Sequence, residues 1–205
     1  SENTTSTTLT PSGTSGSVNI TASASLFAAT DVGRLVSFSN GRAKITGFTS
    51  ATVVAATVQD NFDNTNAVTT WKLGAFSGTT GHPSCVSFFE QRLVFAGTNS
   101  EPQTLYFSKS GDYENMTTGT NADDAMVYTI ASNQVNRIRY LKSQRTLIVG
   151  TTGGEFTVSA DGTDAAITPT NIVIKKQSSY GTANVDAIPA GNSVLFLQKA
   201  KRKIR

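Results

Sequence analysis

The fold is indicated by one stretch, Gln91-Arg92-Leu93-Val94-Phe95-Ala96-Gly97-Thr98, which occurs twice in the chain. It recurs 53 residues later as Gln144-Arg145-Thr146-Leu147-Ile148-Val149-Gly150-Thr151. Each copy has a polar turn followed by an apolar strand. A weaker third copy, Gly191-Asn192-Ser193-Val194-Leu195-Phe196-Leu197-Gln198, begins a further 47 residues on. A period near 50 residues with about four strands per unit is typical of β-propeller blades. We therefore expect residues 81–205 to form partial β-propeller-like blades.

Short β-type runs fill the rest of the chain, and helical periodicity is nearly absent. No stretch of about twelve residues carries a sustained apolar stripe at helical spacing, and a single helical turn is expected over Leu26–Val32. Turn signals such as Asn40-Gly41, Gly153-Gly154 and Asp161-Gly162 separate the runs. Many short strands joined by tight turns indicate an antiparallel, all-β architecture.

Two parts are expected along the chain. Residues 1–17 are rich in Ser, Thr and Gly and predict a flexible N-terminal arm, which leads into a small antiparallel β domain that ends near residue 80. The segment Gly78–Pro83 holds two glycines and a proline, which predicts a linker. Residues 81–205 then hold two full periods and the start of a third, whereas a propeller needs four or more blades. We therefore expect the chain to be part of a longer polypeptide, or its open sheet edges to be covered by another chain.

The composition excludes several classes of protein. The 205 residues carry a formal net charge of +3, and 38% are hydrophobic, which is too apolar for a disordered chain. With one cysteine, Cys85, and one histidine, His82, the sequence offers no internal disulfide and no Cys/His zinc site. No apolar run approaches the ~20 residues of a membrane helix, and residues 1–17 lack the pattern of a signal peptide. We expect no cofactor, no metal site and no membrane-spanning segment.

The residues that suggest catalysis are better explained as structural. Asp123 and Asp124 are adjacent, so in a strand they would point to opposite faces and would not share a proton or a cation. His82 would have to serve any Ser-His-Asp triad, but no nucleophile motif accompanies it. The segment Gly150–Gly154 lacks the Lys-Ser/Thr ending of a phosphate loop and is expected to form a hairpin turn. We therefore expect no catalytic residues and no enzyme.

Two groups of basic residues are the candidates for contact with DNA or with another subunit. Arg137 and Arg139 alternate with Ile138 and Tyr140, so strand geometry predicts that both arginines lie on one face. A plain exposed face, a lumen and a subunit contact stay open for them. The second group could bind DNA phosphates or an acidic neighbour, or could be a solvated last strand. This second group consists of Lys199, Lys201, Arg202, Lys203 and Arg205.

Residues 82–205 resemble the tail nozzle proteins, or tail tubular proteins B, of short-tailed bacteriophages and related prophages. Residues 27–71 resemble, less specifically, the small β insert that such proteins carry before the propeller. The stretches that carry the main resemblance are Gln91–Thr98, Pro102–Thr104, Ser108–Tyr113, Asp123–Ala125, Ala131–Ile138, Leu147–Thr151, Gly154–Phe156, Pro169–Asn171, Gln177–Gly181 and Val194–Gln198.

This resemblance implies a structural protein of the virion, made in the bacterial cytoplasm. Nozzle proteins form a homo-oligomeric six-membered ring below the portal and adaptor, meet tail-fibre proteins, and let phage DNA pass through the lumen. Two alternatives belong to other classes. A carbohydrate-binding adhesin or tail-fibre module would need exposed aromatic side chains that converge on a groove, and a propeller hydrolase would need paired acids.

Overall fold

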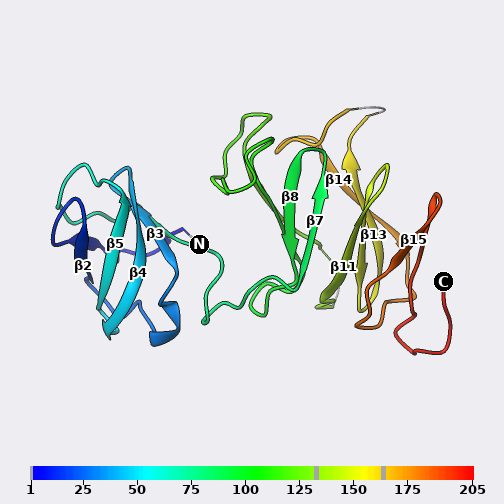
Figure 1. Cartoon of the computed structure of the whole chain (residues 1–205), viewed down its shortest axis with the longest axis horizontal. Helices are drawn as coiled ribbons and strands as arrows, with labels where there is room; N and C mark the ends of the chain where they lie inside the picture. Colours follow the sequence, from blue (N-terminus) through cyan, green and yellow to red (C-terminus); the bar gives the residue numbers. More distant parts are fainter. Residues whose placement is uncertain (1, 132–133, 163–164) are drawn as a thin grey trace. The chain divides into compact units, whose positions relative to one another are not determined.

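The structure is a computed structural model that describes residues 2–131, 134–162 and 165–205. Within these ranges the regular elements are β-strands and one short 3-10 helix, so the prediction of an all-β chain is confirmed. The chain divides into two compact units, Ser1–His82 and Pro83–Arg205 (Figure 1). Each unit has its own hydrophobic core.

The first unit is one six-stranded antiparallel sheet in the order β1-β2-β5-β4-β3-β6. Val18, Ile20 and Ala22 of β2 are buried while the residues between them are exposed, as strands with one core-facing side require. Three irregularities in the pairing of β4 with β5 bend the sheet around its core. The elements are β1 (Leu9–Pro11), β2 (Ser17–Ala22), η1 (Ala29–Asp31), β3 (Leu35–Phe38), β4 (Gly41–Ser50), β5 (Val53–Asp60) and β6 (Trp71–Leu73).

The N-terminal segment belongs to this sheet, so the prediction of a flexible arm was wrong. Leu9 is fully buried and exchanges two backbone hydrogen bonds with Val68. The indole N–H of Trp71 donates to the carbonyl of Thr7 at 2.8 Å, and the Asn3 amide donates to backbone carbonyls around it. Ser and Thr are compatible with strands as well as with flexible linkers. Here the backbone hydrogen bonds to neighbouring strands make the segment part of the sheet.

The predicted helical turn over Leu26–Val32 is present as the 3-10 helix η1. Asp31 at its end is buried and accepts hydrogen bonds from the guanidinium of Arg34 at 3.0 Å and from the hydroxyl of Thr79 at 2.8 Å. The backbone N–H of Ala28 donates to the other oxygen of the same carboxylate. This carboxylate therefore fixes the start of the turn and the end of the first unit together.

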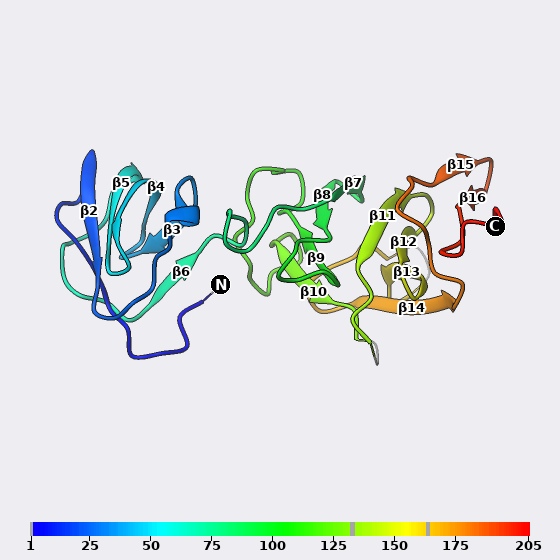
Figure 2. The same cartoon turned by 90° about the horizontal axis from the view of Figure 1, so that it is seen from below.

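The second unit contains two four-stranded antiparallel sheets and a shorter hairpin. Strands that follow one another in sequence are neighbours in each sheet, which is the strand order of a propeller blade. In Figure 2 the two sheets and the hairpin are seen one after another along the unit. The first sheet is β7 (Cys85–Phe89), β8 (Arg92–Ala96), β9 (Thr104–Phe107) and β10 (Met126–Thr129). The second is β11 (Ile138–Ser143), β12 (Leu147–Thr151), β13 (Gly154–Ala160) and β14 (Ile172–Ser178), and the hairpin is β15 (Ile188–Ala190) and β16 (Ser193–Leu195).

The two sheets are stacked strand over strand in the same direction. Cys85 begins β7 and Ile138 begins β11, and the Cys85 thiol lies 3.8 Å from the carbonyl oxygen of Ile138. At the other edge the hydroxyl of Tyr128 on β10 donates to the carbonyl of Pro169, which precedes β14, at 2.5 Å. A single apolar core lies between the sheets, with Phe107 among its fully buried members.

The repeat occupies like positions in the two sheets, but its register differs by one residue from the expected one. Gln91 lies in a two-residue turn and Gln144 in a three-residue turn. Val94 and Leu147, which an offset of 53 would match, both face the core between the sheets. Sheets stacked in the same sense turn opposite faces toward that core, so matching residues cannot both face it. Leu147 therefore matches Leu93, an offset of 54 residues (147 − 93) that the longer turn explains.

The third hairpin covers the face of the second sheet that points away from the shared core. Its turn at residues 191–192 has two residues, like the first copy. The ring of Phe196, just after β16, lies 6.2 Å from the ring of Tyr140 on β11. An isolated bridge from Leu197 to Ile204 adds a further extended segment beside it. The third copy of the repeat thus starts a third layer.

Candidate functional site

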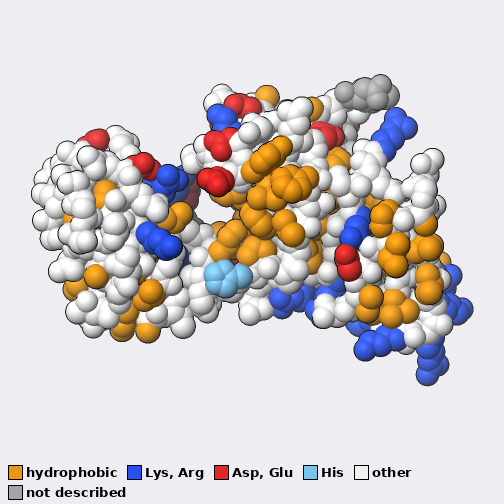
Figure 3. Space-filling view, viewed as in Figure 1, with side chains coloured by type: hydrophobic (Ala, Val, Ile, Leu, Met, Phe, Trp, Pro, Cys, Tyr) orange, Lys and Arg blue, Asp and Glu red, His pale blue; other side chains and the backbone are white. Residues whose placement is uncertain are grey.

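The basic residues at the C-terminal end lie on one reversal of the chain, here called the basic hairpin. The N–H of Gln198 donates to the carbonyl of Lys203 at 2.9 Å, and Lys201 adopts a φ of +56° in the turn. The guanidinium of Arg205 lies 4.2 Å above the ring of Tyr180, which fixes it by a cation–π contact. Figure 3 shows lysine and arginine side chains gathered at this end of the second unit. The exposed members are Lys199, Lys201, Arg202, Lys203 and Arg205.

Arg137 and Arg139 do not act as a pair on one face. Arg137 precedes β11 and donates to the carbonyl of Gly97 and to the amide oxygen of Asn99, both at 2.9 Å, toward the first sheet. Arg139 donates to the amide oxygen of Asn184 at 3.1 Å, toward the third hairpin. A β-bulge in β11 falls at Arg139 and breaks the alternation on which the prediction rested. Both arginines are partly buried and tie neighbouring layers together.

The charge of the second unit is distributed unevenly. Residues 83–131 contain two basic and six acidic side chains, whereas residues 181–205 contain five basic and one acidic. That acid, Asp186, accepts a hydrogen bond from the ammonium of Lys142 at 2.6 Å. The five cations of the basic hairpin therefore face solvent with little local compensation, a pattern that attracts phosphates or an acidic protein surface.

A buried polar row crosses the face of the second sheet beneath the third hairpin. Tyr140, Gly150 and Glu155 are cross-strand neighbours, and the tyrosine ring lies directly over Gly150, where a Cβ would collide with it. The Glu155 carboxylate accepts hydrogen bonds from the hydroxyl of Ser178 and from the backbone N–H of Gly181. Among the described residues, the Tyr140 hydroxyl and the second oxygen of Glu155 are buried without a hydrogen-bond partner.

Burial changes the acidity of this row. It raises the pKa of the Tyr140 hydroxyl, and the nearby carboxylate of Glu155 raises it further. Burial also raises the pKa of Glu155, although the hydrogen bond from Ser178 opposes the change. Sequence analysis missed this row, and the available signal was one acidic residue inside an otherwise apolar strand. A buried carboxylate needs donors, and here the loop after β14 supplies them.

Arg92 is a second functional-looking residue that serves the fold. Its side chain is 2% exposed, and it donates to the carbonyls of Ser108 at 2.8 Å, Asp124 at 2.7 Å and Ala122 at 2.6 Å. Burial lowers the pKa of Arg92, and the charge of Asp123 opposes that change. The guanidinium holds the long loop between β9 and β10 in place and is closed to a ligand.

The residues weighed as catalytic candidates are not brought together. Asp123 pairs with the Lys109 ammonium at 2.9 Å, and this hydrogen bond lowers the pKa of Asp123. Asp124 instead accepts from the backbone N–H of Asn121 at 2.9 Å. His82 is exposed and ends the first unit. Within the described ranges, no group of three or more His, Cys, Asp or Glu side chains is placed to hold a metal.

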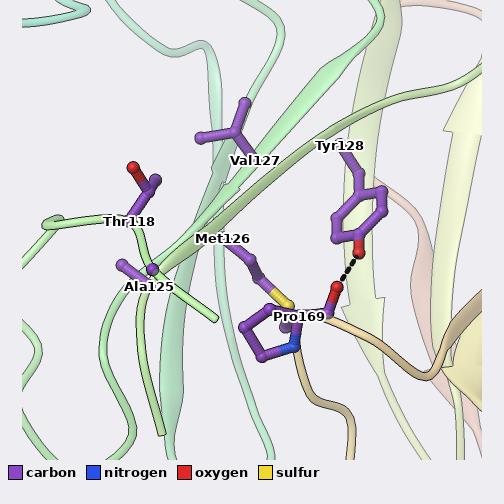
Figure 4. Close-up of a pocket in the computed structure, with 7 residues that line it drawn as sticks. Thr118, Ala125, Met126, Val127, Tyr128 and Pro169 are labelled. Atoms are coloured by element: carbon purple, nitrogen blue, oxygen red, sulfur yellow. Dashed lines mark hydrogen bonds between the residues drawn. The ribbon is translucent and has the colours of Figure 1, made fainter. Parts of the chain in front are cut away.

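A shallow pocket of about 320 Å³ lies beside β10, the edge strand of the first sheet (Figure 4). The pocket is lined by Met126, Val127 and Tyr128 of β10, together with Thr118, Gly119, Ala125 and Pro169. The hydrogen bond from the Tyr128 hydroxyl to Pro169 closes one end. The lining is mostly apolar and carries no ionisable acid or base other than that tyrosine, so the pocket suits packing better than chemistry.

In the part of the chain that the structure describes, no helix is long and apolar enough to cross a membrane. Of the stretches that carry the sequence resemblance, residues 132 and 133 lie outside the described residues. Comparison with known proteins found no match to any protein-family model and no match among curated proteins.

Proposed function

We propose that the chain is a structural, non-enzymatic component of a bacteriophage tail, of the nozzle or tail tubular type. In this role it assembles with copies of itself in a ring, meets portal, adaptor and tail-fibre proteins, and lines a passage for phage DNA in the virion. The observation that carries the proposal is the stack of like four-stranded sheets in Pro83–Arg205. The strands that follow the Gln-Arg turns of that stack coincide with stretches that resemble the nozzle family.

Labelling of phage particles tests this role. An antibody raised against the 205-residue chain is applied to particles purified from the host that carries the gene, and bound antibody is located by immunogold electron microscopy. We expect gold at the tail and none on the head. Particles in which mass spectrometry detects other tail proteins but no peptide of this chain would contradict the proposal.

The basic hairpin is the part proposed to meet DNA during its passage. Its five cations are exposed, and long-range attraction to phosphate needs no sequence-specific contact. The test is binding to duplex DNA as a function of salt concentration. We expect a triple change to Glu at Lys199, Lys201 and Lys203 to weaken binding to all sequences alike, and to reduce the slope of log K against log salt by roughly one per residue removed.

Unit 1 supplies the matched control for this measurement. The same change at three of its exposed cations, Arg42, Lys44 and Lys72, reverses as much charge at sites that are not part of the basic hairpin. We expect this control to keep the salt slope. Equal losses in both triple variants would show that net charge alone drives binding and would remove the basic hairpin from the proposal.

One observation favours the alternative, a carbohydrate-binding adhesin or tail-fibre module. Phe88 and Tyr113 are about half exposed and touch edge to face, with ring centroids 5.1 Å apart, and exposed aromatic rings are what sugars stack on. A glycan array separates the two functions. Binding that is lost in Phe88→Ala and Tyr113→Ala would establish the adhesin, and an array without signal favours the tail component.

A further inference from the structure

The outer edge of the first sheet is formed by β10. The N–H of Ile130 donates to the carbonyl of Gln103 at 3.0 Å, which fixes the alternation of the ladder between β9 and β10. In an antiparallel ladder every second residue turns its N–H and C=O away from the partner strand. Val127 and Thr129 are the residues of β10 that point away from β9. Within residues 2–131, 134–162 and 165–205, no hydrogen bond reaches the backbone of either one.

Side-chain contacts agree with this alternation. Thr104 and Thr129 are opposite each other, and their hydroxyl oxygens lie 2.8 Å apart. Facing side chains come this close in pairs that do not exchange backbone hydrogen bonds. The N–H of Thr104 accordingly donates to the carbonyl of Glu101 at 3.2 Å and not to β10. Val127 is 45% exposed and Thr129 is also exposed, so solvent reaches this edge.

The outermost strands of the two sheets differ in how they treat a further strand. β14 carries Lys175 and Lys176, both exposed, and lysines on an edge strand oppose pairing with another strand. β10 reads Met-Val-Tyr-Thr and holds neither a charge nor a proline. The sequence therefore protects the edge of the second sheet and leaves the edge of the first suited to pairing.

The shallow pocket lies along the same strand (Figure 4). Met126 and Tyr128 point to the side of β10 that faces the core between the sheets, near Pro169, and Val127 points to the opposite side. A strand added at this edge would turn every second side chain toward Met126 and Tyr128. Because the lining is mostly apolar, the pocket favours an apolar side chain there.

Acidic side chains lie at both ends of β10. Residues 83–131 carry six acidic side chains against two basic ones. Asp124 comes shortly before the strand, and its carboxylate lies against Gly119, a residue of the pocket. At the other end, Glu101 accepts a hydrogen bond from the hydroxyl of Thr104, the partner of the last residue of β10. This charge attracts a segment that carries basic residues and repels an acidic one.

We propose that the outer edge of β10 binds an extended segment of a partner protein by β-strand addition. The segment places an apolar side chain in the pocket and carries lysine or arginine at its ends. The backbone groups of Val127 and Thr129 bond to the added strand and supply affinity, while the pocket and the acids select the sequence. This interaction surface goes beyond the proposed function and does not depend on it.

Peptide binding tests the site. The probe is a fluorescently labelled peptide, Lys-Lys-Thr-Val-Thr-Val-Thr-Lys, and its binding to the full chain is followed by fluorescence anisotropy. We expect saturable binding that weakens at least about tenfold in Val127→Pro, because proline removes the outward N–H and keeps the bonds to β9. Val127→Thr keeps that N–H and is the matched control, with an expected change below about twofold.

A second peptide with Glu in place of every Lys tests the charge. We expect it to bind at least about tenfold more weakly than the basic peptide. Equal binding of the two peptides, or equal losses in Val127→Pro and Val127→Thr, would overturn the proposal. The same holds if the basic peptide does not bind at any soluble concentration.

Hydrogen exchange of single backbone amides provides a second readout that needs no variant. We expect the basic peptide to slow exchange at Val127 and Thr129 and to leave Met126 and Tyr128, which bond to β9, unchanged. Binding without protection of Val127 and Thr129 would overturn the proposal. Protection of both amides in the chain alone, rising with its own concentration, would assign the edge to a second copy and would also overturn it. Neither result affects the tail role, which the immunogold label tests.

Discussion

The first and second sheets of the second unit share their strand order and their repeat, yet the same row of each sheet has opposite chemistry. The matching rows are Cys85, Ala96 and Leu105 in the first sheet and Tyr140, Gly150 and Glu155 in the second. The first row packs against a complete four-stranded sheet and is apolar. The second row lies under a short hairpin and under the loop that follows β14. Backbone N–H groups of that loop donate to the Glu155 carboxylate, which is the acceptor they need. The segment that packs on a row thus determines whether its side chains are apolar or polar, whereas turn residues and hydrophobic alternation determine where the strands form.

The arginines of the two Gln-Arg segments differ in the same way. Arg92 is buried and holds the carbonyls of a long loop, while Arg145, at the matching turn, is exposed. The loop between β9 and β10 runs from residue 108 to 125, whereas the connection between β13 and β14 in the second sheet is shorter and runs from residue 161 to 171. One Gln-Arg motif therefore serves two purposes, and the loop beside it determines which.

The largest expected effect comes from moving the acid of the second row into the first. Leu105→Glu places a carboxylate in an apolar core that offers it no donors, and should lower the free energy of unfolding of the second unit by about 4 kcal/mol. Urea unfolding followed by hydrogen exchange of β9 amides measures it. Val127→Glu on β10, 45% exposed, is the control and should cost less than about 0.5 kcal/mol. Equal losses would contradict the comparison of the rows.

The next effect separates the two arginines. Arg92→Met leaves the carbonyls of Ala122, Ser108 and Asp124 without their buried donor, and should destabilise the second unit by about 3 kcal/mol. In the Arg92→Met variant, backbone amide hydrogen exchange should increase first in the loop between β9 and β10. Arg145→Met should change the free energy by no more than about 0.5 kcal/mol. A protected loop in Arg92→Met would show that other contacts hold it.

A smaller effect tests the packing of Tyr140 over Gly150. Gly150→Ala forces the ring to move and should cost about 1–3 kcal/mol. In a Tyr140→Ala background the same change should cost much less, and this double-mutant cycle isolates the contact. The reverse change in the first sheet, Ala96→Gly, should cost about 1 kcal/mol through backbone entropy and a lost methyl group. A cycle with no coupling would mean that the row does not pack as described.

The smallest expected effect is a pH dependence. Because burial raises the pKa of Glu155, its ionisation opposes folding. Stability should be highest below the ordinary Glu value of about 4.3 and should fall as pH rises through the raised pKa of the folded state. Glu155→Gln should lack this fall, as followed by hydrogen exchange of β13 amides across pH. If stability depended on pH in the same way in the Glu155→Gln variant and in the unmodified protein, the Glu155 carboxylate would be solvated rather than buried.

Asp31 in the first unit should behave in the opposite way. Burial raises its pKa, but hydrogen bonds from Ala28 and Thr79 and the charge of Arg34 outweigh burial and lower it. Its contribution to stability is therefore present above the ordinary Asp value and is lost as pH falls through the lowered pKa of the folded state. The two units of the chain thus carry acids with opposite linkage to protons.

Sequence alone predicted the strands and the repeat, because alternation and turn residues are local signals. It missed the one-residue shift between copies, since the extra turn residue at 144–146 becomes visible only when side chains are seen to face a core. It misplaced the Asn40-Gly41 turn by one residue: Ser39 and Asn40 adopt φ of +46° and +57°, and Gly41 begins β4, where a Cβ would strike Phe62.

The candidate site was predicted in part. The cluster Lys199–Arg205 is visible as composition, whereas the chain reversal that carries it, in which Gln198 bonds to Lys203, follows the third copy of the repeat and was not predicted. The separation of Arg137 from Arg139 depends on a bulge, and the burial of Glu155 depends on a hairpin some 30 residues further on, so neither leaves a local pattern. The conformation of the N-terminal segment likewise depends on long-range pairing, because Leu9 exchanges backbone hydrogen bonds with Val68.

The position of Trp71 has a practical consequence. It is the single tryptophan of the chain, it is 6% exposed, and its indole is bonded within the first unit. Its emission therefore monitors the curled sheet and is blind to the stacked layers that follow. Fluorescence and circular dichroism recorded on one sample would yield separate melting curves for the two halves of an uncut polypeptide, an optical dissection that the amino-acid order provides without any label.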